Sequence, residues 1–432
     1  MSRRPLLAAA LALGLASCST KVQVLEPRGP AALADAGLDA GHAAGSDAAV
    51  ERDSALAPLD ANVPARDAAL NEADASLPPV RARLVSAFSQ TCAVRAGALW
   101  CWGNNESGQV GVMSDAGQTR PLRVDPGEFI DVCTGESHSC ALRSDGAAWC
   151  WGDNAHGQLG VGDFKARAVP TELSGARFSA IACGGHGSCG LSPRGALFCW
   201  GENAEGRLGQ GDPTPQMPGT LPDSPLPLAV GSGQSFVKVS LGQGHVCAIN
   251  DRGGLYCWGR NTNGQLGVRD MTEQQRAPVE VEPGTAYAQV AAGQRHTCAV
   301  DLSGKLLCWG ETDLLGVASN LPIVRTPAQV GSDSDYASVA ACWFHTCALK
   351  RSGSLQCWGR NEEGQLGLGD SQPRALPTRV LPELSWTSVA VGQFHTCAFG
   401  KEGLSCWGAN DLGQLGLGDT GRRYVPIDVP FP

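Results

Sequence analysis

The chain has 432 residues, including 56 glycines and 18 cysteines, and only 17% of its residues are charged. This composition is typical of a turn-rich β protein that folds in an oxidising compartment, and it excludes a protein built from long helices. The formal net charge of -9 argues against nucleic acid as the main partner, because no cationic surface is available to neutralise phosphates.

Residues 1–18 are predicted to be a targeting segment. Two arginines precede an apolar run that is too short to span a bilayer comfortably. The sequence LASC, which ends at Cys18, resembles the bacterial lipobox, in which the cysteine is lipidated. We therefore expect a lipid on Cys18 to anchor the protein in a bacterial cell envelope; the alternative is an ordinary secretory signal with a chance cysteine. Because Ser19 and not Asp follows, the expected location is the outer membrane or cell surface.

Residues 19–80 consist mainly of Ala, Asp and Pro, with hardly an aromatic residue. Such a segment cannot bury enough apolar surface to offset the entropy of ordering, so we expect a disordered acidic tether. A coil of some 60 residues has a reach on the order of 40 to 45 Å. The remainder, residues 81–432, is expected to be one repeat domain.

The repeated unit is clearest in the sequence CALKRSGSLQCWGRNEEGQLGLGD, which starts at Cys347. Two short runs, residues 347–350 and 354–357, flank a three-residue loop in which Gly353 suits the left-handed position of a hairpin bulge. This register places Cys347 opposite Cys357, at a Cα separation of roughly 4.5 to 5.5 Å that a disulfide can span. The unit is therefore predicted to be a β-hairpin with a cross-strand disulfide.

The same cysteine pair recurs in every copy, including two copies that are one residue shorter in the turn. The cysteines continue to face one another through that deletion, which favours disulfides over chance. The expected pairs are Cys92–Cys101, Cys140–Cys150, Cys189–Cys199, Cys247–Cys257, Cys298–Cys308, Cys347–Cys357 and Cys397–Cys406. Cys133 and Cys183 occupy nearly equivalent places in consecutive copies and could bridge neighbouring units, which would leave Cys342 outside any disulfide.

A Trp-Gly pair aligns seven copies at a period of roughly 50 residues, the length of a propeller blade. The aligned residues are Trp102, Trp151, Trp200, Trp258, Trp309, Trp358 and Trp407. Each copy has four strand candidates: a Pro-x-x-Val run such as residues 377–380, a run such as residues 386–391, and the two hairpin strands. We predict an all-β, seven-bladed β-propeller of four-stranded antiparallel blades; the alternative is a β-solenoid.

The chain ends suggest how the ring closes. The first copy begins near Arg83 without a Pro-x-x-Val run in front, and residues 424–429 supply such a run after the last hairpin. The C-terminal strand is therefore predicted to pair into the first blade, which would leave no free edge.

The segments HTCALKRSGSLQCWGRNEEGQLGLGD and HTCAFGKEGLSCWGANDLGQLGLGD resemble the regulator of chromosome condensation repeat, and the resemblance covers about residues 83–432. It implies a seven-bladed propeller. By family analogy alone it also implies a guanine-nucleotide-exchange-type regulator, although a fold does not transfer function. The repeat also occurs in a secreted bacterial inhibitor that grips β-lactamase with the loops of one propeller face. An inhibitor or modulator of an envelope hydrolase is therefore a further alternative.

Five copies place a histidine two residues before the first hairpin cysteine, namely His138, His245, His296, His345 and His395. A metal array is conceivable, but each cysteine already has a partner, so structural histidines are expected. The sequence shows no phosphate-binding loop, nucleophile elbow or supported carboxylate pair. We therefore expect neither a cofactor nor catalysis.

Departures from the repeat mark the candidate partner-binding residues. Arg295, Phe344 and Phe394 fill the variable place before the histidine, and Trp343 stands where other copies have glutamine. Arginine and exposed aromatics are the usual anchors of an interface, although Trp343 suits a buried packing role equally well. Alternating strand directions put these turns on the face opposite the chain ends, where we expect a partner to bind.

The predicted function is a monomeric, non-catalytic scaffold that binds a protein or a glycan. Its only expected contact with the membrane is the N-terminal lipid.

Overall fold

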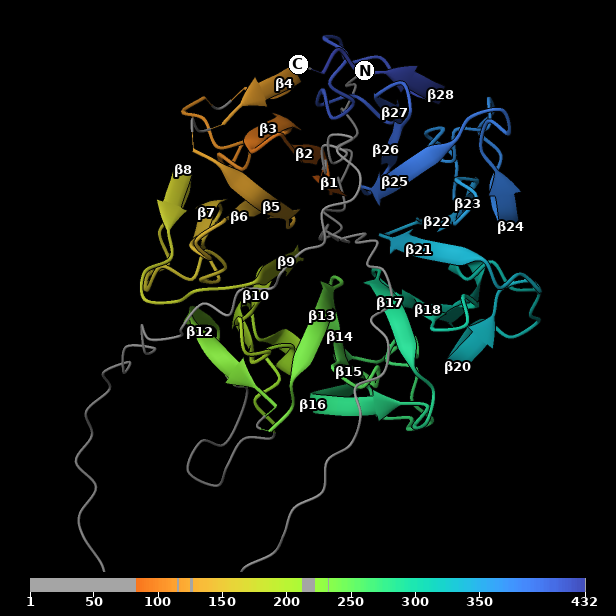
Figure 1. The fold of residues 1–432 in the computed structure, drawn as a ribbon, viewed down its shortest axis with the longest axis horizontal. Helices are drawn as coiled ribbons and strands as arrows, with labels where there is room; N and C mark the ends of the chain where they lie inside the picture. The colour runs from red at the N-terminus through yellow and green to blue at the C-terminus, as the bar shows by residue number, and fades with distance from the viewer. Residues whose placement is uncertain (1–82, 115, 125–126, 212–221, 232, 432) are drawn as a thin grey trace, which may run out of the picture.

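The computed structural model describes residues 83–114, 116–124, 127–211, 222–231 and 233–431. The predicted targeting segment, its Cys18 and the tether lie outside these residues. Within the described ranges, no helix is long and apolar enough to cross a membrane. Seven four-stranded antiparallel sheets stand around a central axis as the blades of a propeller (Figure 1). The predicted all-β, seven-bladed architecture is confirmed.

The first three blades are β1–β4, β5–β8 and β9–β12. Their strands are β1 (Arg83–Ala87), β2 (Gln90–Arg95), β3 (Ala98–Gly103), β4 (Gln118–Arg123), β5 (Phe129–Thr134), β6 (His138–Arg143), β7 (Ala148–Gly152), β8 (Arg167–Glu172), β9 (Ala180–Gly184), β10 (Gly187–Leu191), β11 (Leu197–Gly201) and β12 (Ser224–Val230). A short 3-10 turn, η1 (Ala204–Gly206), follows β11.

The other four blades are β13–β16, β17–β20, β21–β24 and β25–β28. Their strands are β13 (Phe236–Leu241), β14 (His245–Asn250), β15 (Leu255–Arg260), β16 (Gln274–Val281), β17 (Tyr287–Ala292), β18 (His296–Asp301), β19 (Leu306–Glu311), β20 (Ile323–Gln329), β21 (Tyr336–Ala341), β22 (His345–Lys350), β23 (Leu355–Gly359), β24 (Arg374–Arg379), β25 (Trp386–Val391), β26 (His395–Gly400), β27 (Leu404–Gly408) and β28 (Arg423–Asp428). The 3-10 turn η2 (Thr312–Leu314) follows β19.

Every blade is continuous in sequence, and this overturns one prediction. The C-terminal strand β28 pairs with β27 in the seventh blade and not with the first blade. The reason lies in the connection between β27 and β28. The Asn410 side chain donates to the carbonyl oxygens of Asp419 and Gly421, and its Oδ1 accepts from the Leu415 N–H. These bonds fold the connection back, so that the Pro-x-x-Val strand lies beside the hairpin that precedes it.

The ring instead closes by packing of the seventh blade against the first. Gln393 N–H donates to the Phe88 carbonyl oxygen over 3.2 Å, and the Trp102 indole N–H donates to the Gln414 carbonyl oxygen over 2.9 Å. The same two bonds recur at other junctions, for example between Gln294 and Cys342. The closing junction is therefore built like the others.

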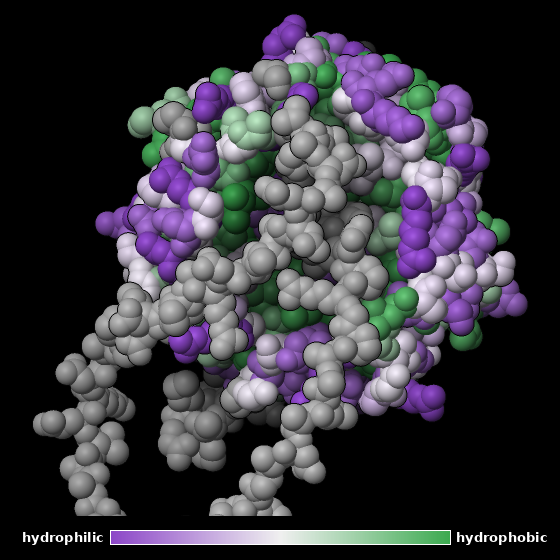
Figure 2. All heavy atoms as spheres, viewed as in Figure 1, coloured by the Kyte–Doolittle hydropathy of each residue, from purple (hydrophilic) through white to green (hydrophobic). Residues whose placement is uncertain are grey.

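The seven Trp-Gly tryptophans are buried between blades. Each indole N–H donates to a backbone carbonyl in the Gly-rich connection of the preceding blade, as Trp200 does to Gln158 over 3.0 Å. Glycine is required beside this contact, because a Cβ on Gly160 would lie 2.7 Å from Trp200 Nε1. Figure 2 shows hydrophobic residues around the inner rim of the ring and mostly hydrophilic residues along its periphery.

The outermost strand of every blade contains proline and is only partly buried. The prolines are Pro121, Pro170, Pro225, Pro227, Pro278, Pro327, Pro377 and Pro426. Proline has no N–H to donate, so it is tolerated at a sheet edge and not in a central strand.

The structure contains the seven hairpin disulfides that the spacing predicts, each with a Cα separation of 4.1 Å. An eighth, Cys133–Cys183, joins the inner strands β5 and β9 and so links the second blade to the third. Cys342 is buried and forms no disulfide within the described part of the chain.

Candidate functional site

The two faces of the ring are built from different loops. The turn between the first and second strands of each blade, and the Gly-rich connection after the third strand, emerge at one end of the blade. We call this end the histidine face. The turns between the second and third strands form the opposite, hairpin face, and the start of β1 and the end of β28 also lie there. Backbone bonds such as Glu136 N–H to the Gly185 carbonyl oxygen, 3.0 Å, link neighbouring turns of the histidine face.

The five repeated histidines are fully buried and hold adjacent blades together. Each Nε2 lies 2.7 to 2.9 Å from a Ser or Thr hydroxyl of the next blade, in the pairs His138–Ser188, His245–Thr297, His296–Thr346, His345–Thr396 and His395–Thr91. That hydroxyl donates to the same carbonyl that accepts the tryptophan indole, as Thr297 does to Gln265 over 2.7 Å.

The direction of these bonds fixes the protonation of the imidazoles. The hydroxyl donates its hydrogen bond to the carbonyl oxygen, so the imidazole Nε2 must be the donor to the hydroxyl oxygen. The ring is therefore the neutral Nε2–H tautomer. Burial lowers the pKa of each of the five histidines to about 3. The histidines are thus committed to blade contacts. Within the described ranges, the one group with metal-ligand spacing is Cys133, Cys140 and Cys183, whose sulfurs are in disulfides.

This arrangement changes at the junction of the third and fourth blades. Gly187 occupies the histidine position, Val246 occupies the hydroxyl position, and Arg207 replaces the glutamine of the Gly-rich connection. The buried Arg207 guanidinium lies 3.0 Å from Glu202 Oε2. A Cβ at Gly185 would lie 2.9 Å from Arg207 Nη1, so the glycines of this turn make room for the guanidinium.

A cluster of ionisable side chains surrounds the altered junction. His186 Nε2 lies 3.3 Å from Glu136 Oε2, and the His186 ring stacks on His156, with a centroid separation of 4.9 Å. His156 Nδ1 lies 2.8 Å from Asp223 Oδ2. Burial, together with the charge of Glu202, raises the pKa of Glu136 to about 8, and burial lowers the pKa of His186. At neutral pH Glu136 is therefore mostly protonated beside a neutral imidazole.

A hollow of about 470 Å³ adjoins this ionic cluster. It is lined by both histidine-face loops and outer strands, with His156, Glu202, Glu205, Asp223 and Arg276 among its charged groups. Glu205 pairs with Arg260 over 2.6 Å, and Glu202 pairs with the buried Arg207. The polar groups that carry charge here are therefore engaged with one another.

Aromatic side chains gather on the opposite part of the histidine face, over the sixth and seventh blades. Phe344 and Phe394 are partly exposed and stack with centroids 5.1 Å apart. The Arg360 guanidinium lies 4.5 Å from the Phe344 ring centroid. Trp343 is only 2% exposed and contacts Phe344 edge-on at 5.3 Å and Phe88 of the first blade at 5.9 Å. We call Phe344, Phe394 and Arg360, with Trp343 beneath them, the aromatic patch.

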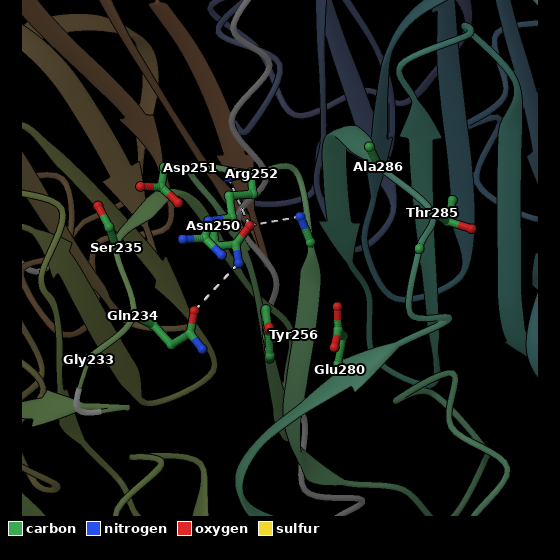
Figure 3. A pocket seen from close by; sticks show the side chains of 12 residues that line it. Gly233, Gln234, Ser235, Asn250, Asp251, Arg252, Tyr256, Glu280, Thr285 and Ala286 are labelled. Atoms are coloured by element: carbon green, nitrogen blue, oxygen red, sulfur yellow. Dashed lines mark hydrogen bonds between the residues drawn. The ribbon is translucent and has the colours of Figure 1, made fainter. Parts of the chain in front are cut away.

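A second hollow, of about 420 Å³, lies on the hairpin face beside the β14–β15 turn (Figure 3). Its central polar side chain is Asn250, whose Oδ1 accepts from the N–H groups of Arg252 and Gly254 over 3.1 and 2.8 Å. The Asn250 amide also donates to Gln234 Oε1 over 3.4 Å. These groups close the turn, and we do not assign a ligand site to them.

Comparisons with known proteins agree with this architecture. Two models described as the regulator of chromosome condensation (RCC1) repeat match residues 96–142 and 145–191, and residues 129–158 and 178–207. A model of the RCC1-like domain matches residues 220–432. The chain belongs to the RCC1 repeat family.

Curated relatives of this RCC1-like propeller match over short segments. The probable E3 ubiquitin-protein ligase HERC4 of Rattus norvegicus is 30% identical over 172 residues, which are 39% of this chain and 12% of the relative. The probable E3 ubiquitin-protein ligase HERC3 of Homo sapiens is 39% identical over 79 residues, 18% of this chain and 8% of the relative. The chain thus spans only a small part of these relatives.

Solved structures share the fold of the RCC1-like propeller. Human WBSCR16 has a TM-score of 0.70 at 22% identity and covers 78% of this chain and 95% of its own. Prp20p of Saccharomyces cerevisiae has a TM-score of 0.65 at 23% identity, covering 76% of this chain and 84% of its own. At this level of identity the likeness concerns the fold alone.

The predicted partner-binding residues of the RCC1-like propeller differ from one another in exposure and in their contacts. Phe344 and Phe394 are brought together and reach solvent, whereas Trp343 is buried and supports them from below. Arg295 is exposed on the neighbouring turn and pairs with Glu311 of its own blade over 3.4 Å. Sequence reasoning missed Arg360, since its place above Phe344 depends on how the third strand of the blade ends. It also missed the ionic cluster, although Gly-Gly-His-Gly at residues 184–187 departs visibly from the repeat.

Proposed function

We propose that this RCC1-like propeller is a non-catalytic scaffold that binds a protein through the aromatic patch, and that a lipid on Cys18 anchors it in a bacterial cell envelope. The observation that carries the proposal is the partly exposed stack of Phe344 on Phe394 with Arg360 above it. Aromatic and arginine side chains that can be desolvated together are the usual hot spots of protein interfaces. The patch is also on the face opposite the chain ends, so a tether leaves it accessible.

The relatives support a protein as the ligand class. The Prp20p structure was described together with its binding to Gsp1p and histones, and another describes Kap60 bound to yeast RCC1 (Prp20). The arrangement of ionisable groups favours a non-catalytic role. The buried histidines are held in blade contacts, and the charged groups of the ionic cluster neutralise one another.

The binding surface can be tested with the full chain as bait in affinity capture from the native cell envelope. Alanine at both Phe344 and Phe394 is expected to weaken capture at least about tenfold, because each removes a ring worth on the order of a kcal/mol or more. Leu302→Ala is the matched control, since Leu302 is 66% exposed in a hairpin-face turn. If the control weakens capture and the phenylalanine variant does not, the site lies on the hairpin face.

The anchor is tested separately. Cys18→Ser is expected to move the protein from the membrane fraction to the soluble fraction and to abolish incorporation of labelled fatty acid. A variant that stays in the membrane fraction with its first 18 residues uncleaved would show that the segment itself anchors the chain.

A further inference from the structure

On the histidine face, more negative than positive side chains are without an ion-pair partner among the described residues. The Gly-rich connections of five blades each place on this face a carboxylate that takes part in no ion pair with any described residue. These carboxylates are Glu106, Asp153, Asp313, Glu362 and Asp411, of which all but Asp153 are exposed. The Asp153 carboxylate accepts hydrogen bonds from the Gln158 side chain and the Ala155 N–H, at 2.8 and 3.2 Å.

The arginines of the same face are largely neutralised. Arg207, Arg260 and Arg295 pair with Glu202, Glu205 and Glu311 respectively. Among the described arginines of these loops, Arg269 and Arg360 take part in no ion pair, and the Arg360 guanidinium lies on the Phe344 ring. The aromatic patch is therefore surrounded by a surface of net negative charge.

We propose that the partner is a polypeptide with a basic segment in which an apolar side chain lies between lysines or arginines. This inference rests on the proposed function and specifies the chemistry of its partner. The apolar side chain would pack on Phe344 and Phe394, and the flanking cations would lie over Glu362, Asp411 and the more distant carboxylates. Such a surface repels nucleic acid and anionic lipid, because both would place phosphates against unpaired carboxylates.

Complementary charge of this kind mainly raises the rate of association, and salt screens it. The apolar contact mainly sets the rate of dissociation. The two parts of the proposal therefore have separate kinetic signatures.

The test uses the full-length Cys18→Ser protein and three synthetic peptides: Lys-Lys-Leu-Phe-Lys-Lys, its Glu-for-Lys counterpart, and Lys-Lys-Ser-Ser-Lys-Lys. Binding is measured at about 20 and 300 mM salt, spanning strong and weak screening. We expect only the first peptide to bind well, at least tenfold more weakly in the higher salt. Glu362→Gln and Asp411→Asn should each slow its association, and together several-fold; Asp251→Asn, which removes one exposed carboxylate from the hairpin face, should not.

The outcomes separate this inference from the proposed function. Equal binding of the acidic peptide, no binding of the basic apolar peptide at millimolar concentration, or salt-independent binding overturns the inference. If a captured partner depends on Phe344 and Phe394 but not on Glu362 and Asp411, the aromatic binding surface stands and the basic partner is ruled out. If a neutral glycan displaces the peptide and binds more tightly, the ligand class is wrong.

Discussion

His245 Nε2 lies 2.8 Å from Thr297 Oγ1 of the next blade, and the Thr297 hydroxyl donates a hydrogen bond to the Gln265 carbonyl oxygen. Thr297→Val keeps the shape of the side chain but leaves the buried imidazole N–H without an acceptor. We expect a loss of about 1 to 3 kcal/mol in the free energy of unfolding, measured in denaturant. Thr297→Ser is the control, because serine occupies this position in two other blades and keeps the hydroxyl. Equal losses from both variants would show that the hydroxyl is unimportant.

The five buried histidines predict that stability falls as the pH is lowered. An unfolded histidine takes up a proton near pH 6.5, whereas the pKa of each of these imidazoles is about 3 in the fold. Between these values the unfolded state binds more protons, so acid favours unfolding. At pH 5 each histidine lowers the free energy of unfolding by up to about 2 kcal/mol relative to its value above pH 7.

Thermal melts between pH 7.5 and 4.5 would measure this dependence. His245→Gln should reduce the number of protons taken up on unfolding by about one, and glutamine is a fitting replacement because Gln90 fills the same position in the first blade. A pH profile identical to that of the unchanged protein would contradict the assignment of a neutral, buried His245.

Glu136 has the opposite effect on the pH dependence of stability. Its pKa is raised to about 8 in the fold, so the folded state holds a proton that the unfolded carboxyl releases above its ordinary pKa of 4.5. The stability contributed by Glu136 is therefore lost as the pH rises from 4.5 to 8. Glu136→Gln, which mimics the protonated acid, should stabilise the protein at pH 8 by at least about 1.4 kcal/mol and much less at pH 4.5. Glu106→Gln, an exposed match, should change stability little at either pH.

The disulfide between the second and third blades should stabilise the fold more than a hairpin disulfide does. Cys133–Cys183 closes a loop with a sequence separation of 50, compared with 10 for Cys347–Cys357. The chain-entropy model gives about 4 kcal/mol for the first and about 2.7 kcal/mol for the second. Double alanine variants of each pair, unfolded in denaturant without reductant, would test the order. A larger loss from the Cys347 and Cys357 variant would contradict it.

The hairpins and their disulfides could be predicted from the sequence because they depend on local spacing. Cys347 and Cys357 are ten residues apart, and the turn residues between them define the register. The pairing of the last strand could not be predicted in this way. A periodic sequence looks the same wherever a unit is taken to begin, and the choice depends on the side-chain bonds of Asn410, which the spacing does not reveal.

Other contacts between blades, unlike the Cys133–Cys183 disulfide, were beyond the reach of the sequence. Trp343 is equally compatible with an exposed and a buried place until the ring brings Phe88 of the first blade against it. The ionic cluster joins residues from three blades, so no single unit contains its pattern. The sequence did contain one signal of the altered junction. Gly187 stands where other blades have the histidine, and Val246 of the next blade stands where others have the hydroxyl.

The prolines of the outer strands bear on how this protein behaves when crowded. Each blade ends in an exposed strand that carries apolar side chains, such as Leu376 at 54% and Ile427 at 37% exposure. Such an edge would ordinarily recruit a strand from another molecule and propagate cross-β aggregation. Here Pro377 and Pro426 remove a donor from the edge and break the continuous ladder that a recruited strand needs. The outer strands can therefore carry apolar side chains and still leave the rings dispersed at high local concentration.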